Sequence, residues 1–100
     1  MVYDQVLKDM QDAVKVGKIR FRRHALEELA NEGLIPADAI QCILTGEIVQ
    51  DQYDPAYQQI KYIIFGTSLT GAEIGVVARW DDYLNVVVIT AFQLEINDYD

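Results

Sequence analysis

Apolar side chains recur every three or four residues through the first half of the chain, which is the spacing of an amphipathic helix. This spacing predicts three helices, near residues 3–16, 25–32 and 36–45. The stripe of the first helix consists of Tyr3, Val6, Leu7, Met10 and Val14. A glycine follows each of the three segments, where glycine commonly ends a helix: Gly17, Gly33 and Gly46.

Elsewhere the apolar and polar residues alternate, which is typical of strands. Between the first two helices, Ile19 and Phe21 alternate with Arg20 and Arg22. After the third helix the pattern predicts a short strand at 47–51 and a loop at 52–58. Three further strands follow, at 59–66, 73–80 and 84–92, and their short connections predict an antiparallel meander. Residues 86–89 are apolar at every position, which indicates a central strand covered on both faces.

Together these elements predict one α+β domain over residues 1–100, with N-terminal helices packed on a C-terminal antiparallel β-sheet. A chain of 100 residues is long enough to bury a core of its own. The acidic tail, residues 93–100, is expected to fray. The expected core contains Val6, Leu7, Met10, Leu29, Ile40, Ile43, Leu44, Ile64, Val76, Val88 and Ile89.

The composition is that of a globular protein in a reducing compartment. Apolar residues make up 51% of the chain and charged residues 24%, a balance that favours a folded domain over a disordered one. The single cysteine, Cys42, rules out an intramolecular disulfide. No apolar run reaches the roughly 18 residues of a membrane-spanning helix, and the N-terminus lacks the apolar block of a signal peptide. We therefore expect a cytoplasmic protein with no membrane partner.

Charge is distributed unevenly along the chain. The net charge of −8 argues against nucleic acid, because a binder must replace phosphate counterions with its own positive charge. However, six of the eight Lys and Arg residues lie within residues 1–23, and the run from Lys15 to His24 contains no acid. Two interpretations of this run stay open. It is either a solvated strand edge, where basic side chains discourage edge pairing, or a site for an anion or a partner.

Metal-free cleavage of RNA needs a group that takes the 2′-hydroxyl proton, a group that protonates the leaving oxygen, and a cation beside the phosphate. His24 is the only histidine and the natural acid–base candidate, because imidazole titrates near neutrality. If the strand runs on into residue 24, alternation puts Arg20, Arg22 and His24 on one face, where guanidinium groups could bind phosphate. The alternative for His24 is a structural role, with its ring bonded to backbone or to a carboxylate.

Other chemistries have weaker support. A metal site needs three or four ligands, and one histidine with one cysteine provides no such cluster, so we expect no metal. A glycine-rich phosphate loop is missing as well, and we expect no cofactor. Five of the aromatic residues in the second half either stack on bases or fill the rim of a small core. These five are Tyr53, Tyr57, Tyr62, Trp80 and Tyr83.

The stretch 19–51 resembles the diagnostic half of a small, mostly bacterial family, the domain of unknown function 4258. The resemblance depends on a strand ending in a histidine–alanine pair, a short helix, and a glycine before the next strand. In this chain the matching residues are His24, Ala25, Leu34, Ile40, Gly46 and Ile48. The segments 61–66 and 86–92, the latter with Thr90, resemble the C-terminal strands of the family, so the resemblance covers about residues 5–92.

That family has been grouped with the RelE-like and barnase-like ribonuclease toxins of toxin–antitoxin systems. The resemblance therefore implies a RelE-like fold and a metal-independent endoribonuclease, with RNA and an antitoxin protein as partners. A second copy of the chain is a further candidate partner. On this hypothesis His24, Arg22 and Arg20 are the catalytic residues. The substrate-binding residues are then Lys18, Arg23, Lys61 and Arg79.

The chain departs from the family in the helix after the histidine. Many members carry arginines where this chain has Glu28 and Glu32. If those arginines contact phosphate, the charge here is reversed, and either RNA binding is lost or the partner differs. If they are only solvated helix surface, the change has no such effect. A second hypothesis is therefore a non-catalytic protein-interaction module, or an inactivated homologue of the same fold.

Overall fold

The computed structural model describes residues 2–94, and this part of the chain contains three helices and five strands. All three predicted helices are present, each within about two residues of its predicted bounds. The predicted fraying of the acidic tail concerns residues that, from 95 on, lie outside the described range. In chain order the elements are α1 (Asp4–Lys15), β1 (Ile19–Phe21), α2 (Arg23–Asn31), α3 (Pro36–Thr45), β2 (Glu47–Asp54), β3 (Gln59–Thr67), β4 (Glu73–Trp80) and β5 (Val86–Gln93).

The strands form one sheet in the order β1-β5-β4-β3-β2. β3, β4 and β5 make the predicted antiparallel meander, and β2 adds an antiparallel edge strand to β3. β1 pairs with β5 in the parallel direction, with Ile19 opposite Val86. The α+β fold with an antiparallel C-terminal sheet is thus as predicted, and the parallel pairing of β1 with β5, which the prediction did not include, makes the whole sheet mixed. β1 and β5 lie far apart in the sequence, so no hairpin fixes their relative direction.

Two strand boundaries differ from the prediction. β2 runs to Asp54, so the first three residues of the predicted loop at 52–58 belong to the β2–β3 hairpin ladder. β5 begins at Val86 and not at residue 84. Leu84 has a φ of 62° and donates its backbone N–H to the carbonyl of Asp81, so it belongs to a tight turn.

Glycine follows α1 and α2 because of its backbone conformation, whereas glycine follows α3 because of close packing. Gly17 and Gly33 have φ angles of +82° and +71°, the left-handed conformation expected after a helix. Gly46 has a φ of −97°, so it needs no such freedom. A Cβ atom at Gly46 would lie 2.4 Å from the carbonyl oxygen of Phe65, so glycine lets α3 approach β3 closely.

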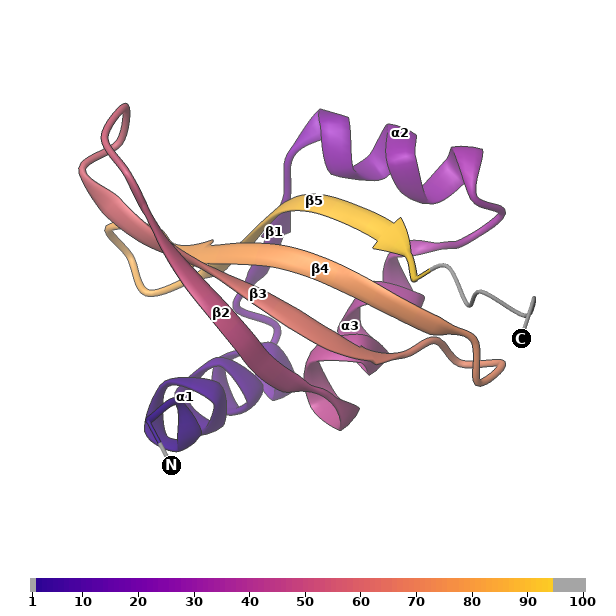
Figure 1. Ribbon diagram of the computed structural model, residues 1–100, viewed down its shortest axis with the longest axis horizontal. Helices are drawn as coiled ribbons and strands as arrows, with labels where there is room; N and C mark the ends of the chain where they lie inside the picture. Colours follow the sequence, from indigo (N-terminus) through magenta and orange to yellow (C-terminus); the bar gives the residue numbers. More distant parts are fainter. Residues whose placement is uncertain (1, 95–100) are drawn as a thin grey trace, which may run out of the picture.

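One face of the sheet, here called the covered face, packs against the helices. α3 lies behind the strands in Figure 1, and α2 runs alongside β5. Six predicted core residues are fully or almost fully buried between these layers: Met10, Leu29, Ile43, Ile64, Val76 and Val88. Four more pack partly buried against them: Val6, Leu7, Ile40 and Leu44.

The prediction that Ile89 belongs to the core is wrong, because Ile89 is only partly buried. It follows the fully buried Val88, and adjacent residues of a strand point to opposite sides of the sheet. β5 also bulges here, since Val88 pairs with Ala78 but the next pair joins Thr90 to Val77, so Ala91 and not Thr90 takes the next buried position. Before the bulge, residues 86–88 are buried at every position, in agreement with a strand covered on both faces.

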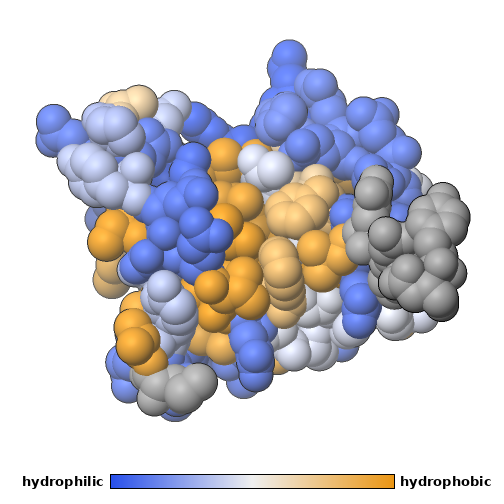
Figure 2. All heavy atoms as spheres, in the orientation of Figure 1, coloured by the Kyte–Doolittle hydropathy of each residue, from blue (hydrophilic) through white to orange (hydrophobic). Residues whose placement is uncertain are grey.

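The opposite, open face of the sheet is turned toward the viewer in Figure 2, which shows an apolar area over the middle strands flanked by hydrophilic side chains. Strand register places Ile63 beside Val77 and Phe65 beside Gly75. Phe92 covers Gly75, whose added Cβ would lie 2.5 Å from that ring. Phe65 and Phe92 meet edge to face at 6.3 Å. These four side chains, Ile63, Phe65, Val77 and Phe92, form the apolar strip.

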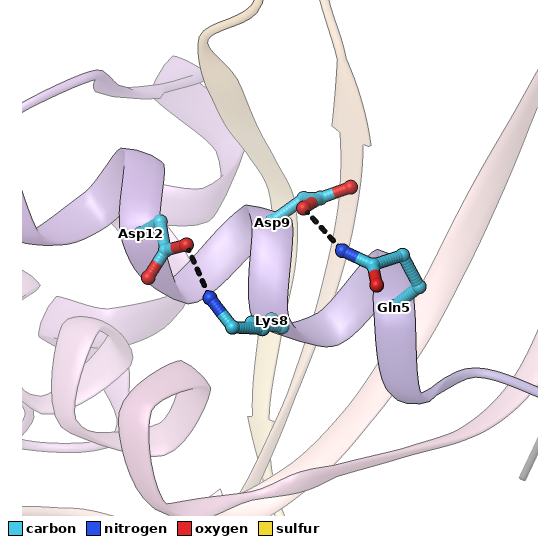
Figure 3. A network of polar contacts seen from close by, with 4 residues as sticks. All are labelled: Gln5, Lys8, Asp9 and Asp12. Atoms are coloured by element: carbon cyan, nitrogen blue, oxygen red, sulfur yellow. Dashed lines mark hydrogen bonds and ion pairs between the residues drawn. The ribbon is translucent and has the colours of Figure 1, made fainter.

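The outer surface of α1 consists of polar side chains that pair with one another. Gln5 Nε2 donates to Asp9 Oδ1 at 2.9 Å, and Lys8 Nζ to Asp12 Oδ2 at 3.0 Å, both one helical turn apart (Figure 3). The hydrogen bond to Asp12 raises the pKa of Lys8. Such exposed pairs add little stability and keep this face of α1 in water. None of the described helices is long and apolar enough to cross a membrane.

Candidate functional site

Two of the predicted cations share one row of the open face. Arg20 on β1 pairs with Val87 on β5, and Val87 pairs with Arg79 on β4. Directly paired residues of neighbouring strands point to the same side of a sheet. Arg20 and Arg79 therefore flank the buried side chain of Val87, and Arg22, two residues after Arg20, continues on the same side.

The β2–β3 hairpin adds an aromatic ring to these cations. The hairpin is shaped by Asp54, whose carboxylate accepts the N–H of Ala56, and by Gln58, which has a φ of 51°. Arg22 Nη2 donates to the hydroxyl of Tyr57 at 2.8 Å. The guanidinium carbons of Arg22 and Arg79 lie 5.7 and 5.0 Å from the centre of that ring. Tyr57 thus holds two guanidinium groups by cation–π contacts, and Arg20, Arg22 and Arg79 form the arginine cluster.

Arg79 is unusual because it is a nearly buried cation without an anionic partner. Its exposed fraction is 9%. Nη1 donates to Gln59 Oε1 and to the carbonyl of Trp80, each at 3.3 Å. Within residues 2–94 none of the three arginines forms an ion pair with a carboxylate. A desolvated guanidinium group is costly unless it is paired, so this cluster is suited to an anion from outside the chain.

Two members of the arginine cluster, Arg20 and Arg79, line a cavity of about 400 Å³, and Arg22 is not among its lining residues. The other residues that line it are Tyr57, Gln59, Asp81, Asp82 and Tyr83. Asp81 stands at its rim. Its carboxylate accepts hydrogen bonds from the side chain and backbone of Asn85 and from the N–H of Tyr83. These bonds lower the pKa of Asp81, and the charge of Arg20 lowers it further. Asp81 thus bonds within its own turn and also interacts electrostatically with Arg20.

His24 does not lie where strand alternation would place it. β1 ends at Phe21 and α2 begins at Arg23, so the condition for sharing a face with Arg20 and Arg22 fails. The chain turns into a helix at the point where a continued strand would have carried His24 onto the open face. His24 is not among the residues that line the cavity. Its Cα can nevertheless lie no more than about 7 Å from that of Arg22, because only one residue separates them.

His24 is paired with a carboxylate that is itself held in place. His24 Nε2 lies 3.2 Å from Glu28 Oε2, one helical turn away, and the His24 side chain is 67% exposed. The other oxygen of Glu28 accepts the backbone N–H of Ala91 at 3.0 Å. β1 pairs with β5 only as far as Val88, so Glu28 satisfies a donor on the edge that β1 leaves open. Glu28 is therefore neither a simple charge reversal nor solvated surface.

The other predicted binding residues are divided between the two sides of the molecule. Lys61 lies on the open face, because Tyr62 pairs with Ala78 and the residues beside this pair, Lys61 and Arg79, point to the opposite side. Lys18 lines a different cavity, bounded by α1 and Trp80. Arg23 is an exposed residue at the start of α2. The arginine cluster thus gains Lys61 as a neighbour, but not Lys18.

Two contributors were not among the predicted site residues. Tyr57 was recognised only as one of several aromatic residues, because the hairpin that carries it to Arg22 joins segments 35 residues apart. Glu28 was interpreted as a lost arginine. The spacing of four residues between His24 and Glu28 was the available signal, since such pairs face each other on a helix.

A second cavity, of about 460 Å³, lies at the same end of the sheet. Tyr53, Ile60, Tyr62 and Trp80 line it, and we call this set the aromatic groove. The two cavities have Gln59 and Asp81 as common wall residues. Burial raises the pKa of Tyr62, and the charge of Asp51 raises it further, so its hydroxyl is a proton donor at neutral pH.

Cys42 is buried and hydrogen-bonded, as a structural thiol would be. Its Sγ lies 3.7 Å from the carbonyl oxygen of Ile64 and 3.6 Å from that of Ile74. Burial raises its pKa to about 12, so the thiol stays protonated and unreactive. Among residues 2–94, no three His, Cys, Asp or Glu side chains are grouped so that they could hold a metal ion.

Comparison with known proteins gives one match. A family model described as "Domain of unknown function (DUF4258)" matches residues 21–93. No curated protein and no solved structure matches the chain. The matched range contains Arg22, Tyr57 and Arg79 and the His24–Glu28 pair, whereas Arg20 and α1 precede it.

Proposed function

From the premise that this chain belongs to the DUF4258 family, we propose that it is a toxin-type, metal-independent endoribonuclease that binds RNA phosphates at the arginine cluster. The observation that carries the proposal is a nearly buried Arg79 beside Arg20 and Arg22, with no carboxylate paired to any of them within the described range. A RelE-like relationship, an antitoxin partner and a cytoplasmic location belong to the same proposal.

The arginine cluster supplies what phosphoryl chemistry needs most. Guanidinium groups bind phosphate through two parallel N–H bonds and keep their charge at any physiological pH. Tyr57 fixes Arg22 and Arg79 in place before the ligand arrives, which reduces the entropy lost on binding. Cations fixed beside a phosphate stabilise the charge that develops when the 2′-hydroxyl attacks the phosphorus.

The His24–Glu28 pair supplies the acid–base group in this proposal. A carboxylate that orients an imidazole is the usual arrangement of a general base and its positioning group. Glu28 is fixed by its bond to Ala91 and engages Nε2 of His24, which leaves Nδ1 to exchange a proton with substrate. His24 lies two residues from Arg22 in the sequence, so the two Cα atoms are at most about 7 Å apart.

RNA binding is tested with a fluorescent single-stranded RNA whose anisotropy is measured over a range of salt concentrations in EDTA. Arg22→Gln removes one exposed cation of the cluster, and we expect weaker binding and a slope of log K against log salt that is smaller by about 0.7. Lys15→Gln is the matched control, because it removes the same charge from exposed α1 and should change neither quantity. Equal effects of the two variants would show non-specific attraction and contradict the proposal.

Cleavage is tested by gel electrophoresis of the same RNA and by the growth of bacteria that express the chain. We expect the wild type to cleave RNA in EDTA and to slow growth. His24→Ala should bind RNA normally but cleave it about 10² to 10⁴ times more slowly. Matching thermal unfolding of His24→Ala and wild type excludes a loss of fold. A wild type that leaves RNA intact and growth normal would overturn the nuclease proposal.

A second candidate function is a non-catalytic protein-interaction module, and the apolar strip favours it. Phe65 is 38% exposed on the open face of the sheet. The strip is bordered by Lys61 and Arg79, so the partner it fits presents apolar side chains flanked by acids. Should RNA neither bind nor be cleaved, Phe65→Lys would be the variant to test against a partner identified by co-purification.

A further inference from the structure

The aromatic groove and the cavity of the arginine cluster meet at the end of the sheet. Arg79 and Trp80 are consecutive residues of β4, so their side chains point to opposite sides of the sheet. Gln59 and Asp81 line both cavities at the edge where the strands end. Gln59 is held there by its bond to Arg79 Nη1. A ligand at the arginine cluster can therefore continue around this edge into the groove.

The groove offers flat, accessible ring faces. Tyr53 on β2 pairs with Ile60 on β3, and Tyr62 lies two residues further on the same side. Tyr53 is 63% exposed, whereas Tyr62 and Trp80 are partly buried. Tyr3 supports Tyr62 from behind, edge to face at 6.4 Å. Tyr62 and Trp80 thus form a fixed wall and Tyr53 an accessible ring, and a planar group of a ligand could stack on these rings.

Charge distinguishes the two cavities. Arg20 and Arg79 line the first cavity together with Asp81 and Asp82, whereas the residues that line the groove include Asp81 but no Lys or Arg. A phosphate needs the cations of the first cavity, whereas an uncharged heterocycle needs none. A single nucleotide has the same two parts, an anionic phosphate and a neutral planar base, at neighbouring positions.

We propose that the aromatic groove is a nucleobase subsite, in which a base of single-stranded RNA stacks on Tyr53, Tyr62 and Trp80 while the adjoining phosphate binds the arginine cluster. This inference rests on the proposed function and adds its substrate class, an unpaired strand. A base in a duplex is already stacked and paired, so it cannot enter the groove without being extruded. Stacking accepts any base, which predicts little sequence preference.

The test compares a short single-stranded RNA with an abasic strand that carries the same number of phosphates. Trp80 is the only tryptophan of the chain, so its fluorescence reports directly on the groove. We expect the RNA, and not the abasic strand, to quench Trp80, and the RNA to bind about tenfold more tightly. Tyr53→Ala should remove that difference while leaving the abasic strand unaffected.

Leu69→Ala is the control, because Leu69 is an exposed side chain on the β3–β4 connection, at the opposite end of these strands. It should change neither affinity. Equal binding of the RNA and the abasic strand by wild type, or an unchanged RNA affinity in Tyr53→Ala, would overturn the subsite and leave phosphate binding standing. A failure of both strands to bind would overturn the proposed function as well. An RNA duplex that binds as tightly as the single strand would also contradict the inference.

Discussion

The two faces of the sheet are made from the same strands but carry different kinds of residue. On the covered face, Ile64, Val76 and Val88 are aliphatic and fully buried. On the open face, neighbouring positions of the same strands hold partly exposed aromatic rings and the cations Lys61 and Arg79. Since adjacent residues of one strand differ only in the side to which they point, one backbone carries both the core and the arginine cluster. The aromatic groove, with Tyr62 and Trp80, lies on the covered side at the end of the sheet.

The comparison shows that Arg79 is retained on the open face although its desolvation costs free energy. The covered face needs no cations, and every core residue there lowers the free energy of the fold by burial. Arg79 is desolvated on the opposite side, where a hydrophobic residue of similar size would fit a folded domain at least as well. Stability does not explain its presence, and the proposed phosphate site gives this cation a role.

The largest expected effect is on the covered face. Ile64→Ala should lower the free energy of unfolding by about 2–5 kcal/mol, because the side chain is completely buried. Ile63→Ala is the matched variant, one residue earlier on the open face, and should cost about 1 kcal/mol. Urea unfolding of both proteins provides the measurement. Equal losses would mean that the open face is buried in solution, for example by a second copy of the chain.

The next largest effect concerns Glu28, which joins α2 to the open edge of β5. Glu28→Ala leaves the N–H of Ala91 without its acceptor and should cost about 1–2 kcal/mol in urea unfolding. Glu28→Gln retains an oxygen acceptor and should lose less. Glu32→Ala, an exposed change one turn further along, should stay within about 0.5 kcal/mol of wild type. If Glu32→Ala were as unstable as Glu28→Ala, the loss of stability would come from the removed negative charge and not from the lost hydrogen bond to Ala91.

The smallest effect is expected from Asp81, in the turn that bounds both cavities. Its folded-state pKa is lowered, so the folded form favours the carboxylate. That stabilisation is present above the ordinary pKa of 3.8 and is lost as the pH falls through the lowered value. Asp81→Asn should therefore melt slightly below wild type near neutral pH, by a few degrees at most. The two melting temperatures should converge in strong acid, and a constant difference at every pH would contradict this.

Local patterns predicted most of the fold. The helical stripes and the strand alternation depend on neighbouring residues, and α1, α2, α3 and the meander formed as expected. The pairing of β1 with β5 and the bulge at Ile89 depend on contacts between distant segments, which a periodic pattern does not contain. For this reason the sequence predicted the meander but not the pairing of β1.

The same distinction applies to the candidate site. Arg20, Arg22, Arg79 and Lys61 were identified from charge alone, and the sheet brings them to one face. The place of His24 was not predictable, because alternation says nothing about where a strand becomes a helix. Tyr57 lies 35 residues after Arg22 in the sequence, and only the folded β2–β3 hairpin brings the two side chains together.

The parallel pairing of β1 with β5 has a consequence for the order in which the molecule folds. Ile19 pairs with Val86, so this contact closes a loop of more than sixty residues, whereas each hairpin of the meander closes a short one. Closing a longer loop costs more entropy, and contacts of high sequence separation slow folding. The meander can therefore form while β1 is still detached, and β1 carries Arg20 and Arg22 into place only when it docks. A nascent chain that has not yet released β5 from the ribosome would lack the arginine cluster, and the three arginines would come together only in the last step of folding.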